Sequence, residues 1–195
     1  MADPIRLIVG LGNPGSEYRG TRHNAGAEFV EELARQCGST LQPESKFFGM
    51  AGRVSLAGHE LRLLIPTTFM NRSGKSVAAI ANFYKISPEE ILIAHDELDI
   101  PAGTARFKQG GGHGGHNGLR DIVPALGNSK NFHRLRIGIG HPGDRERVLS
   151  YLTRERPTRQ EQDAVDASLT RALEALDIWF AQGWDKAVQA LHTSG

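Results

Sequence analysis

The sequence predicts an α/β protein, a single-domain three-layer α/β/α sandwich with a twisted mixed sheet. Short apolar, β-rich runs alternate along the chain with amphipathic segments of helical period, which is the pattern of strands and their covering helices. Tight turns rich in glycine and asparagine follow several of these runs. No repeat, low-complexity tract or linker interrupts the 195 residues, so we expect one domain over residues 1–195.

The first half of the chain contains four predicted strands and two predicted helices. Thr21 is a suitable N-cap for a helix that continues to about Gln36, because apolar residues such as Phe29 and Leu33 recur on one face. A second helix is expected to end near Lys85, after a loop that follows Pro66. The strands are expected over residues 5–9, 47–57, 61–65 and 91–94.

The second half contains two further strands and three helices. Thr158 and Glu161 form a capping-box pattern, which predicts the start of a long amphipathic helix carrying Leu169 and Leu173. The run His133–Ile139 alternates basic and apolar residues, as a strand with one exposed face does. The remaining elements are a strand at 105–108 and helices near 119–126 and 145–152.

The composition is that of an ordinary globular protein, with 39% hydrophobic and 23% charged residues. The N-terminus leads into an apolar strand without a signal-peptide pattern, and no apolar stretch approaches the roughly 18 residues of a membrane span. Cys37, the single cysteine, has no partner for an internal disulfide, which is typical of the reducing cytoplasm. Because Cys37 falls within the first helical pattern, we expect it to fill the core.

Charge is unevenly distributed along the chain, although the formal net charge is only +1. Residues 104–159 carry eleven Lys/Arg and four Asp/Glu, whereas residues 160–195 carry two and six. A basic middle segment can form one face that meets an anion, or it can be a solvated surface. The composition therefore permits nucleic-acid binding without requiring it.

Polar residues gather in loops next to the predicted strands, which is where α/β folds place their sites. Asn13 offers a carboxamide directly after the first strand. The five loops are Asn13-Pro14-Gly15, Thr21-Arg22-His23-Asn24, Phe69-Met70-Asn71, His95-Asp96 and Gly110–Gly118.

The segment Gly10–Gly15 matches the G-x-G-x-x-G pattern of dinucleotide sites. That pattern requires a helix that opens at the loop, so that backbone N–H groups meet the pyrophosphate. Here the helical pattern begins only at Thr21, and Pro14 lacks one of the needed donors. We therefore favour a structural turn over a nucleotide site.

His113 and His116, three residues apart, raise the alternative of a metal site. A helix could present both imidazoles on one face, but the five surrounding glycines disfavour a helix here. The chain also lacks a cysteine cluster and an H-E-x-x-H motif. We expect no metal, and instead a loop whose backbone lies close to a ligand.

A histidine and a carboxylate remain as candidates for catalysis, because the sequence has no G-x-S-x-G nucleophile elbow. His23 lies at a predicted helix start, and Asp96 follows an apolar strand. Asp96 could accept the imidazole N–H, fix its tautomer and raise its basicity, so that His23 deprotonates water near neutral pH. On spacing alone, however, a surface residue at a helix start is the favoured interpretation of His23.

Taken together, these loops resemble the bacterial peptidyl-tRNA hydrolase family. Several long and unusual motifs carry the similarity, which runs in order over about residues 5–150 and is weaker only in the C-terminal helices. The motifs are Ile8–Gly15, Tyr18, Thr21–Gly26, Pro66–Asn71, Ser73-Gly74, His95–Asp99, Gly110–Leu119 and Phe132–Gly140.

The resemblance implies a monomeric enzyme, without cofactor or metal, that hydrolyses the ester between a peptide and the 3′ end of tRNA. It implies that His23 is the general base, that Asp96 orients it, and that Asn13 helps to position the water and the ester. Asn71 and Asn117 would hold the peptide main chain near the bond. Peptidyl-tRNA is then the expected partner, with no role for a membrane.

The same resemblance assigns two further groups of residues. The group expected to line the cleft is Tyr18, Phe69, Met70 and His116. The group expected to grip tRNA phosphate is Arg106, Lys108 and Arg136. Arg106 stands where lysine is the more usual residue, so the charge is kept but the grip would be bidentate. A non-catalytic RNA-binding protein on the same fold remains the alternative, because a fold does not determine function.

Overall fold

The computed structural model describes residues 4–193, which fold around one seven-stranded mixed sheet of order β2-β3-β4-β1-β5-β7-β6. The central strands β4, β1, β5 and β7 are parallel, whereas β2–β3, β3–β4 and β6–β7 pair antiparallel. The strands are β1 (Leu7–Gly10), β2 (Gln42–Glu44), β3 (Gly49–Leu56), β4 (His59–Pro66), β5 (Ile91–Glu97), β6 (Ala105–Gln109) and β7 (His133–Gly138).

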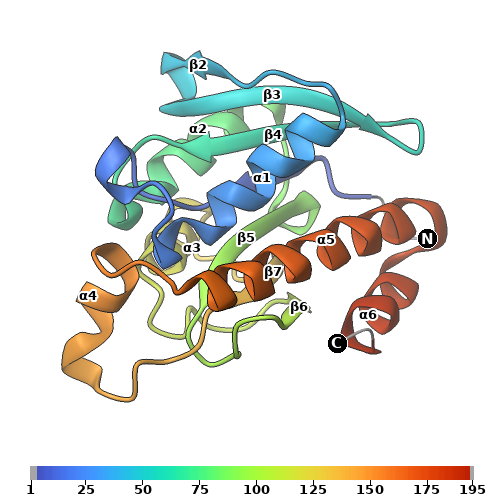
Figure 1. Cartoon of the computed structure of the whole chain (residues 1–195). Coiled ribbons are helices and arrows are strands. Elements are labelled where there is room, and N and C mark those ends of the chain that lie inside the picture. The colour runs from blue at the N-terminus through green and yellow to red at the C-terminus, as the bar shows by residue number, and fades with distance from the viewer. Residues whose placement is uncertain (1–3, 194–195) are drawn as a thin grey trace.

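Helices cover both faces of the sheet and make three layers (Figure 1). One apolar core joins the sheet to α1 (Ala25–Gln36), α5 (Arg159–Gln182) and α6 (Trp184–Thr193). The other joins it to α2 (Ser73–Tyr84) and α3 (Asn117–Ala125). The predicted three-layer α/β/α sandwich is therefore confirmed. None of the helices within residues 4–193 combines the length and apolar character that spanning a bilayer requires.

The central strands are buried on both faces, as their short apolar runs predict. In β1, Ile8 faces the core beneath α1 and α5, whereas Leu7 and Val9 face the core beneath α2 and α3. All three side chains are 0% exposed. Each such side chain contributes about 1.5–3 kcal/mol through burial. The middle of the sheet is therefore a rigid support for the loops at its carboxyl edge.

The start of α1 differs from the sequence prediction. Residues Arg22–Asn24 form a 3₁₀ turn, and the α-helix begins at Ala25. Thr21 occupies the N-cap position of this turn, but its hydroxyl donates to the carbonyl of Tyr18 instead of accepting from a helix N–H. The N-cap of α1 is Asn24, so the prediction that Thr21 caps this helix is wrong. This tighter turn buries His23, which is not the exposed residue that spacing alone favoured.

Cys37 is exposed just beyond the last residue of α1. The prediction that it fills the core is wrong, because the helix and its buried stripe end before the residue is reached.

The Thr158–Glu161 capping box at the start of α5 is confirmed. The sequence prediction lacks β2, a three-residue edge strand containing Pro43 that is too short to show an alternating pattern.

Strand β5 continues past the predicted end at Ala94 through His95 and Asp96 to Glu97. Asp96 is thus held by ladder hydrogen bonds at the carboxyl end of a central strand rather than by a loop. The short helix α4 (Val148–Thr153) packs beside the 3₁₀ turn that carries His23. These two placements bring the candidate site together.

Candidate active site

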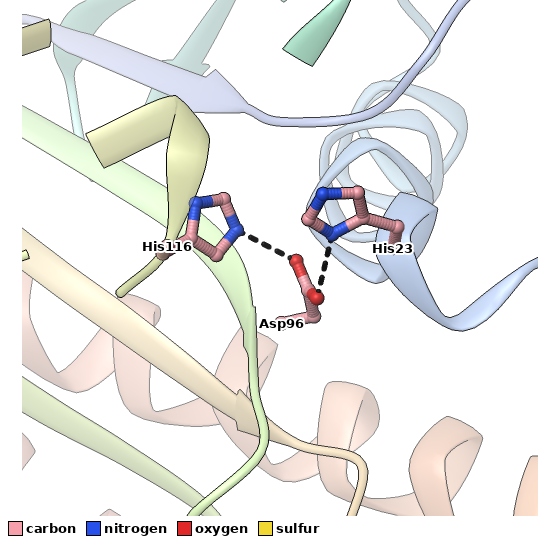
Figure 2. A group of neighbouring side chains, drawn as sticks. All are labelled: His23, Asp96 and His116. Atoms are coloured by element: carbon pink, nitrogen blue, oxygen red, sulfur yellow. Dashed lines mark hydrogen bonds and ion pairs between the residues drawn. The ribbon is translucent and has the colours of Figure 1, made fainter. Parts of the chain in front are cut away.

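Two histidines meet on one buried carboxylate at the carboxyl edge of the sheet (Figure 2). Asp96 is 3% exposed. His23 Nδ1 lies 2.8 Å from Asp96 Oδ2, and His116 Nε2 lies 2.8 Å from Asp96 Oδ1. The histidines come from the 3₁₀ turn before α1 and from the N-cap of α3. Only the fold brings together these segments, which are far apart in the sequence.

The neighbouring carboxylate of Asp96 raises the basicity of His23. Burial lowers the pKa of His23, but the negative charge of Asp96 and the hydrogen bond to it outweigh this effect, so the pKa of His23 is raised overall. Burial alone would raise the pKa of the Asp96 carboxyl, yet its interactions with His23 and His116 hold that pKa well below its usual range. Because Nδ1 of His23 is hydrogen-bonded to Asp96, Nε2 is the nitrogen that can accept a proton.

His23 lines a cleft of about 590 Å³. Tyr18 and Phe69 form an edge-to-face pair in its wall, with ring centroids 6.4 Å apart. The predicted residues that line this cleft are Asn13, Tyr18, His23, Phe69, Met70, Asn71 and Asn117. His116 is not one of them; its side chain is only 9% exposed and is hydrogen-bonded to Asp96.

Asn24 holds Asn13 in place, a role that the sequence analysis did not assign. The Asn13 backbone N–H donates to Asn24 Oδ1 over 2.8 Å, and Asn24 Nδ2 donates to the Asn13 carbonyl over 3.0 Å. The Met70 N–H then donates to Asn13 Oδ1 over 2.7 Å. These bonds leave the Nδ2 hydrogens of Asn13 available to a ligand in the cleft. The position of Asn24 beside His23 was the only indication in the sequence.

The glycines of the G-x-G-x-x-G segment allow close packing against α1 and its preceding turn. A Cβ on Gly12 would lie 2.9 Å from Asn24 Cγ, and one on Gly10 would collide with the Gly26 carbonyl. Larger residues would therefore push the Asn13 loop away from the 3₁₀ turn that carries His23. This packing accounts for the motif as a structural turn, which is the interpretation that the sequence favoured.

Arg134 on β7 fastens the glycine-rich loop, and the sequence analysis did not single it out. Its buried guanidinium donates to the carbonyls of Gly111 and Gly112, and it lies over the ring of Phe132. The loop ends at His116, so Arg134 helps to place that residue. The alternation of basic and apolar residues in β7 was the indication in the sequence. Every second side chain of a strand points to the same face of the sheet, so Arg134 lies on the same face as Arg136.

The residues that could hold a metal in the described part of the chain are His23, Asp96 and His116, whose ligand atoms lie within 4.8 Å of one another. The same atoms already make two hydrogen bonds of 2.8 Å, which a cation would have to replace. His113 is not part of this group, and its Nδ1 accepts from the Gly115 N–H. The expectation of a metal-free site stays a prediction.

The predicted phosphate-binding residues lie on one face of the β6–β7 pair. Arg106 stands opposite Arg136 in the antiparallel register, and Lys108 stands opposite Arg134. Arg106 and Lys108 are exposed. Arg136 is less exposed, and its Nε donates to Glu97 Oε1 over 3.1 Å. An arriving phosphate would therefore meet Arg106 and Lys108 directly, and would share Arg136 with Glu97.

Helix α4 contributes cleft residues that the sequence analysis missed, among them Leu149 and Thr153. Leu149 is 68% exposed, and a leucine in a short helix gives no signal that it faces a cleft rather than the core. Arg22 links α4 to the 3₁₀ turn that carries His23. It donates to the Tyr151 carbonyl and to Glu161, and its guanidinium lies 3.8 Å from the centroid of the Tyr151 ring.

Comparison with known proteins agrees with this geometry. The model of the peptidyl-tRNA hydrolase family matches residues 7–195. The chain belongs to the peptidyl-tRNA hydrolase family. The peptidyl-tRNA hydrolase of Shewanella denitrificans is 61% identical over 189 residues, which are 97% of this chain and 96% of the relative. That of Vibrio parahaemolyticus is 58% identical over 193 residues, or 99% and 98% of the two chains.

A crystal structure of the peptidyl-tRNA hydrolase from Acinetobacter baumannii matches the fold with a TM-score of 0.93. The identity is 51%, and the match covers 99% of this chain and 98% of that one. The family that the sequence motifs indicated is therefore confirmed, and its fold is the one described above.

Proposed function

We propose that the chain hydrolyses the ester between a peptide, or an N-blocked aminoacyl group, and the 3′ end of tRNA. Peptidyl-tRNA is then the substrate, and free tRNA is released for reuse in translation. The observation that carries the proposal is the His23–Asp96 pair in a cleft lined by three carboxamides, those of Asn13, Asn71 and Asn117. Gripping phosphate requires none of these groups, which disfavours a non-catalytic RNA-binding protein.

The reaction needs one activated water and no covalent intermediate. His23 Nε2 takes a proton from water, whose oxygen attacks the acyl carbon while Asp96 stabilises the imidazolium. Asn13 Nδ2 donates to the developing oxyanion without adding charge. The tetrahedral intermediate then expels the ribose oxygen, which takes the proton back from His23. The products are tRNA and a peptide carboxylic acid, which releases its proton to solvent and becomes a carboxylate. The absence of a serine elbow from the sequence is consistent with this route.

Selectivity for a blocked amino group follows from the carboxamides. Asn71 and Asn117 line the same cleft as His23, and their amides can bond the first peptide group of the substrate. A free aminoacyl-tRNA lacks that group and would leave these amides unpaired once the substrate covers them, which is a strong source of discrimination. Tyr18, Phe69 and Met70 would supply the apolar wall beside them.

The deciding assay compares N-blocked aminoacyl-tRNA with its unblocked form, each with and without EDTA. We expect rapid cleavage of the blocked ester, slow cleavage of the free one, and no effect of EDTA. Binding of tRNA without cleavage would favour the RNA-binding alternative. Loss of activity in EDTA would contradict the metal-free mechanism.

Arg106 and Lys108 are proposed to contact tRNA phosphate together with Arg136. Replacing Arg106 and Lys108 with alanine should weaken tRNA binding and reduce the slope of log K against log salt by about one for each lost contact. Titrations at several salt concentrations measure this slope. A double variant at two exposed basic residues elsewhere, Arg53→Ala with Lys186→Ala, is the control. An unchanged slope in the Arg106→Ala, Lys108→Ala variant would mean that another surface binds the tRNA phosphates.

We also propose that residues 1–195 form one domain that acts as a cytoplasmic monomer. The continuous sheet and its two cores support the single domain. The unpaired Cys37 is consistent with a reducing compartment.

A further inference from the structure

Both ring nitrogens of His116 make hydrogen bonds, and one of them must accept a hydrogen whereas the other must donate one. Nδ1 lies 3.1 Å from the Gly118 backbone nitrogen and 3.4 Å from that of Leu119, at the N-terminus of α3. A backbone N–H can only donate, so Nδ1 must be an unprotonated acceptor. The imidazole hydrogen therefore resides on Nε2.

That Nε2–H donates to Asp96 Oδ1 over 2.8 Å, while the other carboxylate oxygen, Oδ2, is hydrogen-bonded to His23 Nδ1. We propose that His116 is a positioning residue, a fixed N–H donor that orients the Asp96 carboxylate and moderates the charge that Asp96 presents to His23. The inference rests on the proposed function, in which His23 is the base. It differs from the cleft-lining role that the family resemblance implies for His116.

The surroundings of His116 hold the ring in this orientation. Its backbone N–H donates to the His113 carbonyl over 3.0 Å, at the end of the loop that Arg134 fastens. On the other side, a Cβ on Gly118 would lie 2.8 Å from Met70 Sδ and 3.1 Å from His116 Cε1. The glycine at position 118 therefore lets the first turn of α3 pack closely against the ring, whose orientation is held by its hydrogen bonds to Asp96 and to the Gly118 N–H.

His95 packs on the other side of the same ring. Its imidazole lies edge-on to His116, with centroids 5.1 Å apart, and its Nδ1 bonds to the Asp96 carbonyl. Burial, with a smaller effect of His116, lowers the pKa of His95 to about 3, so this neighbour stays neutral. Other charged groups around His23 in the described part of the chain include Glu17 and Arg154, which line the cleft, and Arg22, which bonds to Glu161.

The variant His116→Asn is designed to remove the hydrogen bond to Asp96 while keeping a side-chain cap on α3. Asparagine is a good helix N-cap, so α3 keeps a cap, but its side chain is too short to replace the donor to Asp96. Without that donor the Asp96 charge acts more strongly on His23. We expect the acid limb of the kcat–pH profile to move up by about one unit. At pH values below the shifted limb, the kcat of the variant should be up to about ten-fold lower than that of the parent. The high-pH plateau of kcat should be retained, and KM should be nearly unchanged.

Two comparisons make this result specific. His116→Ala loses the cap as well, so it should show the same limb shift together with a lower melting temperature. In an Asp96→Asn background, His116→Asn should no longer move the limb. A raised KM with an unmoved limb would instead assign His116 to substrate contact. A wild-type profile in His116→Asn would reduce its role to capping α3. Either outcome overturns the proposal.

Nitrogen NMR of ¹⁵N-imidazole-labelled wild-type protein tests the tautomer without any turnover. At a pH above the acid limb, where His23 is neutral, we expect the proton on Nε2 of His116 and on Nδ1 of His23. A proton on Nδ1 of His116 would overturn the inference even if the chain hydrolyses peptidyl-tRNA as proposed. Failure of the hydrolysis assay with the expected tautomers would instead count against the proposed function.

Discussion

Replacing His23 with alanine should remove nearly all ester hydrolysis while leaving tRNA affinity close to that of the parent. The imidazole is a group in the cleft whose pKa is raised by a bonded carboxylate, and its Nε2 is the base of the proposed mechanism. Loss of a general base costs about 10²–10⁴-fold in kcat. Single-turnover hydrolysis of an N-blocked aminoacyl-tRNA measures the loss, and a binding titration in parallel measures the affinity.

His59→Ala is a suitable control, because it removes an exposed imidazole at the start of β4, away from the cleft residues. This variant should keep the parent rate. Turnover of His23→Ala within a few-fold of the parent would remove His23 from the mechanism. An equal loss of tRNA binding would mean that the substitution disturbs the fold around the 3₁₀ turn.

Asp96→Asn is expected to have the second largest effect. The introduced carboxamide would offer one oxygen where two imidazole N–H groups now donate to Asp96. Its amide hydrogens would then face a ring nitrogen and favour the wrong tautomer. A comparable carboxylate-to-amide change in a serine protease lowers kcat about 10⁴-fold, so we expect a loss on the order of 10²–10⁴-fold here. The measurement is kcat across a pH series.

The pH dependence of this variant has a definite sign. In the parent, the Asp96 charge and hydrogen bond raise the pKa of His23, so activity falls as pH drops through a value above that of an ordinary histidine. Removing the charge lowers that pKa, and the residual activity of Asp96→Asn should persist to lower pH. This shift is opposite to the one expected for His116→Asn. An acid limb that stays in place would leave Asp96 with only a structural role.

The order of elements could be predicted from local pattern alone. The strands and helices of the sheet follow from apolar periodicity and from signals such as the Thr158–Glu161 capping box. Two elements were not predicted, the edge strand β2 and the C-terminal helix α6, and the other errors fell at boundaries, where local rules compete with packing. At Thr21 the chain tightens into a 3₁₀ turn before α1, and at Cys37 the helix has already ended.

The sequence by itself determined the fold class, the family motifs and the chemical types that the site contains, because these depend on residue identity and order. Only the tertiary structure decided that His116 lies on Asp96 rather than in the cleft wall, and that Arg134 and Asn24 hold the loops that carry the site. The reason is physical. Hydrogen bonds between side chains 20 or 73 residues apart in the chain, such as His116–Asp96 and His23–Asp96, leave no periodic trace in the sequence. They form only where strands and helix ends meet at the carboxyl edge of the sheet.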